Sequence, residues 1–301
     1  MKLWDTHLHT DFSGDCDAAP ESMIRGAKQL GLPGICFTDH LDWDHSDNPN
    51  PYVLDVDNYL PKCRSLAQEQ HVLAERRLTL ARQQAQAEGR LTLAQEQRAL
   101  ADTAGGLTIC AGIEIGVQPH LVERVKRLVA EHSFDFVIAS THLSGAHDLP
   151  DIPLFKELSE DASYETYCRR IHRNVQLFDD FDVYGHLDYV VRYGPNKNQY
   201  YSYEKFADII DEILKALIHK GKGIEINTSG YKYGLGQSHP TAAILKRYRQ
   251  LGGEIITIGS DAHKPEHIAY DFDKVPGILQ EAGFRYYTVF QERKPMFLPL
   301  A

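Results

Sequence analysis

The chain alternates short apolar runs with longer segments in which apolar residues recur every three or four positions. Between the short runs lie amphipathic stretches such as 203–220, where Ile209, Ile213 and Leu217 fall on one helical stripe. The alternation predicts parallel strands joined by helices, and seven such units favour a closed or nearly closed barrel over an open sheet. The seven predicted strands cover residues 2–4, 34–38, 107–113, 134–140, 182–185, 223–227 and 254–259. An eighth run at 286–290 is expected to flank or finish the barrel.

The segment 64–104 departs from this rhythm, because it is dominated by Ala, Gln, Glu, Arg and Leu. It predicts helix, and Gly89 offers a break between two arms of a helical hairpin that projects from the barrel. We favour a surface insertion over a dedicated partner-binding device, since a seven-residue leucine spacing over so few repeats is weak support for a coiled coil. The leucines with this spacing are Leu66, Leu73 and Leu80 in one arm and Leu93 and Leu100 in the other.

Composition and charge narrow the class of protein. The 301 residues are 43% hydrophobic and 25% charged, which is typical of a globular chain and compatible with one large domain. The 32 Lys and Arg against 42 Asp and Glu give a net charge of −10, which disfavours nucleic acid as a partner. Five cysteines without a Cys-x-x-Cys pair argue against a disulfide framework and favour a reducing cytosol. With no signal-like N-terminus and no run of about 18 apolar residues, we expect a cytoplasmic protein that does not bind membranes.

Histidines and acids follow most of the predicted strands. His7 and His9 are two apart on an extended chain, so both imidazoles can face one ion. The alternative for such a pair is a surface or hydrogen-bonded role, but the pattern repeats along the chain. Because the carboxyl ends of parallel barrel strands meet at one mouth, these groups predict a metal site there. The other strand-end groups are Asp39-His40, Glu114, His142, His186 with Asp188, and Asp261 with His263.

These motifs resemble those of the polymerase and histidinol phosphatase (PHP) family, over residues 1–300 apart from the insertion. The sequences Gly185-His186-Leu187-Asp188 and Glu225-Ile226-Asn227 look most like the stand-alone histidinol phosphatases. The resemblance implies one distorted, TIM-like (β/α)7 barrel domain over 1–301, with 64–104 inserted in it. It also implies three divalent ions, of zinc, manganese or iron, at the mouth.

Carried over position by position, the ligands fall into three sets. Glu114 would bridge the first two ions, and Asp15 is chosen from a loop that also holds Asp11 and Asp17. The implied sets are His7, His9, Glu114 and Asp261 for the first ion, Glu114, His142 and His186 for the second, and Asp15, His40 and His263 for the third.

The implied reaction is attack on phosphorus by a metal-bound hydroxide, with Glu114, Asp261 and His239 as catalytic residues. No Gly-x-Ser-x-Gly elbow or Walker loop is present, so no phosphoenzyme is expected. Arg192 is expected to hold a phosphate oxygen, and the alternative is a salt bridge to Asp188 or another acid. Lys232 and His239 lie in a Gly-rich loop, where they can contact the substrate, protonate the leaving group, or play no part.

We therefore expect a metal-dependent phosphomonoesterase that acts on L-histidinol phosphate, or on another small phosphate ester. A zinc amidohydrolase is an alternative, but such barrels commonly need a bridging lysine, and no Lys follows the fourth predicted strand. A catalytically silent PHP interaction module is a third alternative, opposed by the full ligand set. Exposed leucines in 64–104 would allow self-association.

Overall fold

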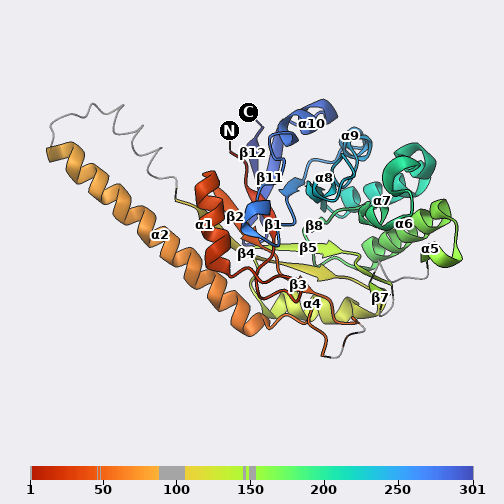
Figure 1. Ribbon diagram of the computed structural model, residues 1–301, viewed down its shortest axis with the longest axis horizontal. Coiled ribbons are helices and arrows are strands. Elements are labelled where there is room, and N and C mark those ends of the chain that lie inside the picture. The colour runs from red at the N-terminus through yellow and green to blue at the C-terminus, as the bar shows by residue number, and fades with distance from the viewer. Residues whose placement is uncertain are drawn as a thin grey trace.

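The fold is built on one sheet of parallel strands, seen in the computed structural model, which describes residues 2–45, 47, 49–87, 106–144, 147–148 and 154–300. Neighbouring strands follow the order β1-β2-β4-β5-β8-β9-β10, and β3 pairs with β4 (Figure 1). The strands are β1 Asp5–Leu8, β2 Gly34–Phe37, β3 His40–Leu41, β4 Thr108–Gly116, β5 Phe136–Ser140, β8 Val183–Tyr184, β9 Gly223–Asn227 and β10 Ile256–Gly259.

The first and last strands meet at their carboxyl ends. The Asp261 amide donates a hydrogen bond to the His7 carbonyl over 2.9 Å, and the His9 amide donates to the Ala262 carbonyl over 2.9 Å. A parallel bridge joins Leu8 to Ala262. These bonds draw the two edges of the sheet together at the mouth, so the prediction of a nearly closed, distorted barrel is confirmed.

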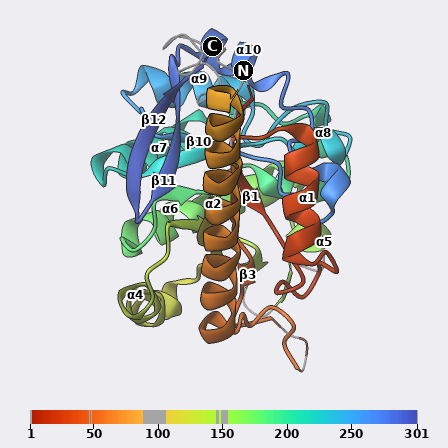
Figure 2. The same ribbon diagram turned by 90° about the vertical axis from the view of Figure 1, so that its left-hand side faces the viewer.

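Helices cover the outside of the barrel (Figures 1 and 2). The apolar stripe predicted in 203–220 is buried in α7, where Ile213, Leu214 and Leu217 pack inward. The helices are α1 Pro20–Leu30, α2 Val56–Ala87, α4 Val122–Glu131, α5 Leu154–Glu157, α6 Glu160–Leu177, α7 Ala207–His219, α8 Ser229–Lys232, α9 Ala242–Gln250 and α10 Val275–Ala282. Short 3₁₀ helices span Pro119–Leu121, Tyr189–Tyr193, Lys197–Gln199, Tyr203–Phe206 and Pro265–His267.

Two of the differences from the predicted strand boundaries move site residues into strands. The first strand is Asp5–Leu8 instead of 2–4, and the third extends to Gly116, so His7 and Glu114 lie within strands. The polar residues of β1 stay in an extended strand because their side chains find hydrogen-bond partners inside the barrel. The Asp5 carboxylate, for example, accepts hydrogen bonds from the amide and hydroxyl of Ser260.

The eighth apolar run flanks the barrel without joining its sheet. It forms β11 (Tyr286–Gln291), which pairs antiparallel with β12 (Lys294–Pro299). The two-residue turn between them has positive φ at Glu292 (49°) and Arg293 (64°), as in a type I′ hairpin. The turn is fixed to the barrel, because Arg293 Nε donates a hydrogen bond to the carboxylate of Asp182, next to β8, over 2.6 Å. A second small hairpin pairs β6 (Leu143–Ser144) with β7 (His147–Asp148).

The predicted insertion begins as a continuation of a barrel helix. α2 starts at Val56 and runs without a break to Ala87, instead of starting near residue 64. Its first part packs on the barrel through the buried Tyr59, Cys63 and Leu66, and the helix then projects beyond the sheet. The predicted second arm, with Leu93 and Leu100, lies outside the described residues. Among the described helices, none has a stretch long and apolar enough to cross a membrane.

Candidate metal centre

All nine predicted ligands lie at the carboxyl end of the barrel, although the sequence separates them by up to 256 positions. Parallel strands deliver them there, since each stands at a strand end or in the loop that follows. His7 lies in β1, His40 in β3 and Glu114 in β4. The remaining ligands follow strands: His9 and Asp15 follow β1, His142 follows β5, His186 follows β8, and Asp261 and His263 follow β10.

Glu114 lies at the centre of the cluster and directs its two oxygens to different histidines. Its Oε1 is 3.1 Å from Nε2 of His142 and 2.9 Å from Nε2 of His186. Its Oε2 is 3.2 Å from Nε2 of His7 and 3.7 Å from Nε2 of His9. This geometry allows one carboxylate to bridge two cations, as expected for Glu114.

The acids at the edge of the cluster complete two more groupings. Asp261 Oδ1 lies 3.3 Å from His9 Nε2, next to the His7 and Glu114 group. Asp15 Oδ2 lies 3.1 Å from His263 Nε2 and 3.7 Å from His40 Nε2, which are its predicted partners. Asp15 is therefore the acid of its loop that approaches these histidines.

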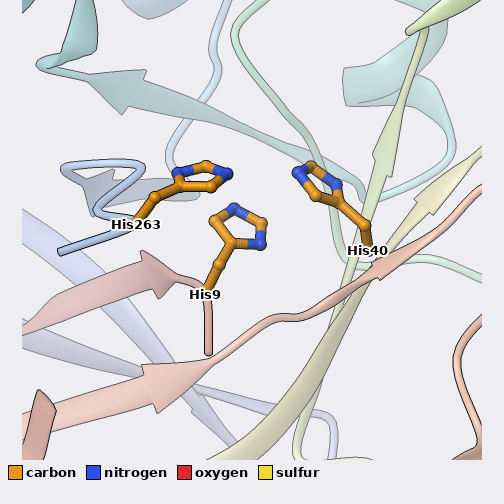
Figure 3. Close-up of side chains that lie close together, drawn as sticks. All are labelled: His9, His40 and His263. Atoms are coloured by element: carbon orange, nitrogen blue, oxygen red, sulfur yellow. The ribbon is translucent and has the colours of Figure 1, made fainter. Parts of the chain in front are cut away.

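The rings of His9, His40 and His263 surround a common space (Figure 3). The His9 ring stacks on His40 with centroids 4.0 Å apart and on His263 with centroids 4.2 Å apart. One nitrogen from each of the three rings lies within 4.8 Å of the others. His9, which the sequence assigned to the first ion, is therefore also within reach of the third.

The donor atoms fit divalent cations. Nε2 of His7, Nε2 of His9 and Oε2 of Glu114 are buried and make no hydrogen bond within the described residues, although they converge on one another. Buried polar atoms without partners are costly, so their convergence fits a site that binds a cation. Imidazole and carboxylate donors together suit zinc, manganese and iron.

The electrostatics of the cluster keep its acids ionised. Burial raises the pKa of Glu114, but the neighbouring His7, His142 and His40 outweigh it and hold that pKa well below the usual value. Asp261 likewise has a strongly lowered pKa, because His9 and His263 outweigh the effect of burial. Both carboxylates are therefore in the anionic form that binds cations.

Further polar residues, to which no role was predicted, orient the ligands. Glu225 in β9 is fully buried, and its Oε1 lies 2.7 Å from Nδ1 of His7. This contact turns Nε2 of His7 toward Glu114. Gly259 makes room for it, since a Cβ there would lie 2.2 Å from Glu225 Oε1. An acid inside an otherwise apolar strand was the sequence signal for Glu225.

The backbone of Asp261 is also constrained. Its φ of 53° lies in the left-handed region, which a residue with a side chain rarely adopts. The hydrogen bond that the Asp261 amide donates to the His7 carbonyl and the 2.9 Å hydrogen bond from Lys232 Nζ to the Asp261 carbonyl hold it there. Lys232 therefore supports the backbone of a predicted ligand as well as facing the cavity.

A cavity of about 360 Å³ opens over the cluster. Its wall combines predicted ligands with cations and tyrosines. The lining residues are Asp15, His40, His142, His186, Tyr189, Arg192, Lys232, Tyr233, Asp261, His263, Lys264 and His267. Tyr189, Tyr233, Lys264 and His267 were not predicted, although Tyr189 directly follows the Gly-His-Leu-Asp motif.

Arg192 is a cation without a carboxylate partner among the described residues. Its guanidinium carbon lies 4.0 Å from the ring centre of Tyr189 and 4.2 Å from that of Tyr233. Nη2 donates to the hydroxyls of Tyr189 and Tyr193, whereas Nη1 is buried and unpaired. The alternative salt bridge to Asp188 is absent. Arg192 is thus fixed by tyrosines with one donor free, as an anion-binding arginine would be.

Asp188 instead pairs with His239. Its Oδ1 lies 2.5 Å from His239 Nδ1, and both side chains are buried. His239 is absent from the cavity wall, and its ring centre lies 6.4 Å from that of Tyr189. Its Nε2 has no partner in the described part of the chain. A catalytic or substrate-binding role for His239 stays a prediction.

Comparison with known proteins assigns the family. The PHP domain model matches residues 5–229, so the chain belongs to the PHP family. The chain is 28% identical over 301 residues to the histidinol-phosphatase of Lactococcus lactis, covering 98% of this chain and 96% of that protein. It is 26% identical to a probable histidinol-phosphatase of Clostridium acetobutylicum, covering 98% of both chains.

A solved structure shares the fold over almost the whole length. It is the crystal structure of a histidinol phosphate phosphatase from Lactococcus lactis in complex with zinc, L-histidinol and phosphate. The two chains are 25% identical, the TM-score is 0.79, and the match covers 98% of this chain and 99% of the other.

Proposed function

We propose that the chain hydrolyses L-histidinol phosphate to L-histidinol and phosphate at the cluster of histidines and acids around Glu114. The observation that carries the proposal is the position of Arg192, an unpaired cation that faces the same cavity as the candidate metal ligands. The full-length similarity to the Lactococcus lactis enzyme, whose structure holds zinc, L-histidinol and phosphate, supports the substrate and the metal.

The proposed ligand sets are those predicted from the sequence, with three divalent ions. When bound, such ions supply an activated water near neutral pH and neutralise charge on the phosphoryl oxygens. Glu114 and Asp261 take part as anionic ligands next to the reacting group. Zinc is the favoured metal, because a relative of full-length similarity binds it.

The proposed roles of the cations follow from their partners. Arg192 faces the cavity and donates from its guanidinium to a phosphate oxygen, while Tyr189 and Tyr193 hold it through Nη2. Lys232 faces the same cavity from α8, and burial lowers its pKa. It contributes positive charge next to Asp261 and attracts the anionic substrate.

We propose the predicted role of His239, protonation of the leaving alkoxide, with Asp188 as the residue that orients its ring. Because His239 Nε2 is buried and does not line the cavity, this role requires the ring to become accessible when the ester binds. The His239→Gln variant tests this role. It should lose more activity toward histidinol phosphate than toward p-nitrophenyl phosphate, because nitrophenolate leaves without a proton. Equal losses on both esters would exclude proton donation by His239.

A phosphate-ester panel tests the function itself. We expect the purified protein, with its metal content measured, to release phosphate fastest from L-histidinol phosphate. A higher kcat/KM for another small ester would change the substrate and keep the reaction class. Metal-loaded protein that releases no phosphate from any ester would contradict the proposal and favour the silent-module alternative.

Five free cysteines and the biosynthetic substrate make the cytoplasm the proposed location.

A further inference from the structure

His142 offers its two ring nitrogens to two different groups of possible ligands. Nε2 lies 3.1 Å from Glu114 Oε1, and Nδ1 lies 3.0 Å from Asp42 Oδ2. By distance alone, His142 could therefore hold a cation either with Glu114 and His186 or with His40 and Asp42. A neutral imidazole carries one proton and has one nitrogen free to bind a metal, so only one of these groups can use His142.

Asp42 is held firmly at this position. Its amide donates to the Tyr52 carbonyl over 2.9 Å, and its carbonyl accepts from Asn50 Nδ2 over 2.7 Å. Its side chain is only 5% exposed. The carboxylate is therefore placed by the backbone of the loop that follows β3, with Oδ2 toward His142 and with a buried Oδ1 that makes no hydrogen bond in the described part of the chain.

The end of β4 is shaped around this carboxylate. A Cβ at Gly116 would lie 1.6 Å from Asp42 Oδ1, which no other residue at that position could tolerate without displacing Asp42. Oδ1 thus faces the β4 backbone, and Oδ2 faces His142. Since Gly116 has an ordinary negative φ, its lack of a side chain serves this close approach and no turn.

We propose that Asp42 is a positioning residue, which accepts the Nδ1 proton of His142 and so directs Nε2 to the cation shared by Glu114 and His186. The grouping of His40, Asp42 and His142 is then no metal site. This inference rests on the proposed metal cluster. Carboxylates that hold ligating histidines in this way change metal affinity without touching the ion.

The test measures divalent-ion binding by the full-length protein, with zinc as the probe. Asp42→Ala should lower the affinity for one of the bound ions about 10- to 100-fold and leave the affinity for the others unchanged. Asp42→Asn should recover most of that affinity, because its amide oxygen still accepts the Nδ1 proton. The unfolding temperature of the metal-free protein should stay the same in both variants.

Two further variants separate this role from a general effect of the loop. Gly116→Ala displaces the Asp42 carboxylate without removing a polar atom, so it should weaken the same ion. Asp44→Ala is the matched control, because Asp44 lies two residues away and accepts hydrogen bonds from Gln118 and His120 instead. It should bind zinc like the unmodified chain.

Three results would overturn the inference. Unchanged zinc affinity in Asp42→Ala would show that His142 needs no such partner. Equal losses in Asp42→Asn and Asp42→Ala would indicate that Asp42 binds the ion directly. If the unmodified protein binds no divalent ion, the proposed function fails together with the inference. The first two results would instead overturn the inference alone, so the two failures are distinguishable.

Discussion

The mouth of the barrel buries ionisable side chains, whereas the outer part of α2 exposes apolar ones, and both are the reverse of what is usual in a globular protein. At the mouth, His7 and Glu114 are fully buried, whereas on α2 Leu73 is 36% and Leu80 58% exposed. Buried ionisable groups cost folding free energy unless they are paired, and exposed leucines gain none from the core. The mouth is therefore arranged for binding, while this part of α2 lies outside the packed domain.

The largest effect should come from the centre of the cluster. Glu114→Ala removes the carboxylate that the first two proposed ions share, so it should abolish phosphate release and lower the metal bound per chain. Metal analysis and initial rates check this together. The variant should remain folded, because the substitution removes a buried charge. Full metal content with normal turnover would exclude Glu114 from the site.

A smaller effect is expected at the wall of the cavity. Arg192→Ala should lower kcat/KM roughly 100-fold, as expected for loss of one charged donor to a developing anion in a dry site. Metal content should not change. The control is Arg169→Ala, an exposed arginine that pairs with Glu165 on α6. A change of less than twofold in Arg192→Ala would show that the ions alone hold the phosphate.

Removal of the metal should destabilise the fold through the mouth alone. An ion at about 100 times its dissociation constant adds roughly 2.7 kcal/mol to the free energy of unfolding. Chelation should therefore lower the unfolding temperature by several degrees, measured by calorimetry. Glu114→Ala should show a much smaller response. Equal unfolding temperatures with and without chelator would contradict a cluster that binds cations in the folded state.

The smallest effect is expected in α2. The last buried residues described in α2 are Leu66 and Gln70, so the removable part begins after Ala74. Ala74 Cβ would lie 2.5 Å from a Cβ on Gly106, so a short linker can join the two sides. Replacing 75–103 with a Gly/Ser linker should keep kcat/KM within twofold.

The outcome of this deletion decides whether the insertion is only a surface feature. Loss of self-association without loss of activity would agree with an exposed leucine stripe that packs on a second copy. A soluble, metal-loaded deletion variant without activity would show that this segment acts at the site, which would remove the contrast between the two regions.

The sequence was sufficient for the barrel because strands and helices follow local patterns, and the structure brings together the residues that the resemblance implied as ligands. Strands alternate with helices, and the ligands stand at strand ends, where parallel topology brings them together. The boundaries were less accurate. The first strand was predicted at 2–4, before Asp5 and His7, but the interior of the mouth satisfies polar groups in extended backbone, and the strand covers Asp5–Leu8.

Contacts between distant residues could not be predicted in this way. Asp42 meets His142 across 100 positions, and Glu225 meets His7 across 218. No short motif encodes either pair. The tyrosines that hold Arg192 show the same limit, since Tyr233 reaches it from a separate loop. The hairpin of β11 and β12 was missed because its turn contains Glu292 and Arg293, without the Gly or Asn typical of such turns.

The most direct test of the account is a reconstitution titration. Metal-stripped protein is mixed with increasing equivalents of zinc, and phosphate release from L-histidinol phosphate is measured at each step. We expect no turnover without metal and a rise to a plateau as the cluster fills, with the same titration inactive in Glu114→Ala. Full activity in the stripped protein, or no activity at any zinc content, would contradict a metal-dependent phosphatase at this site.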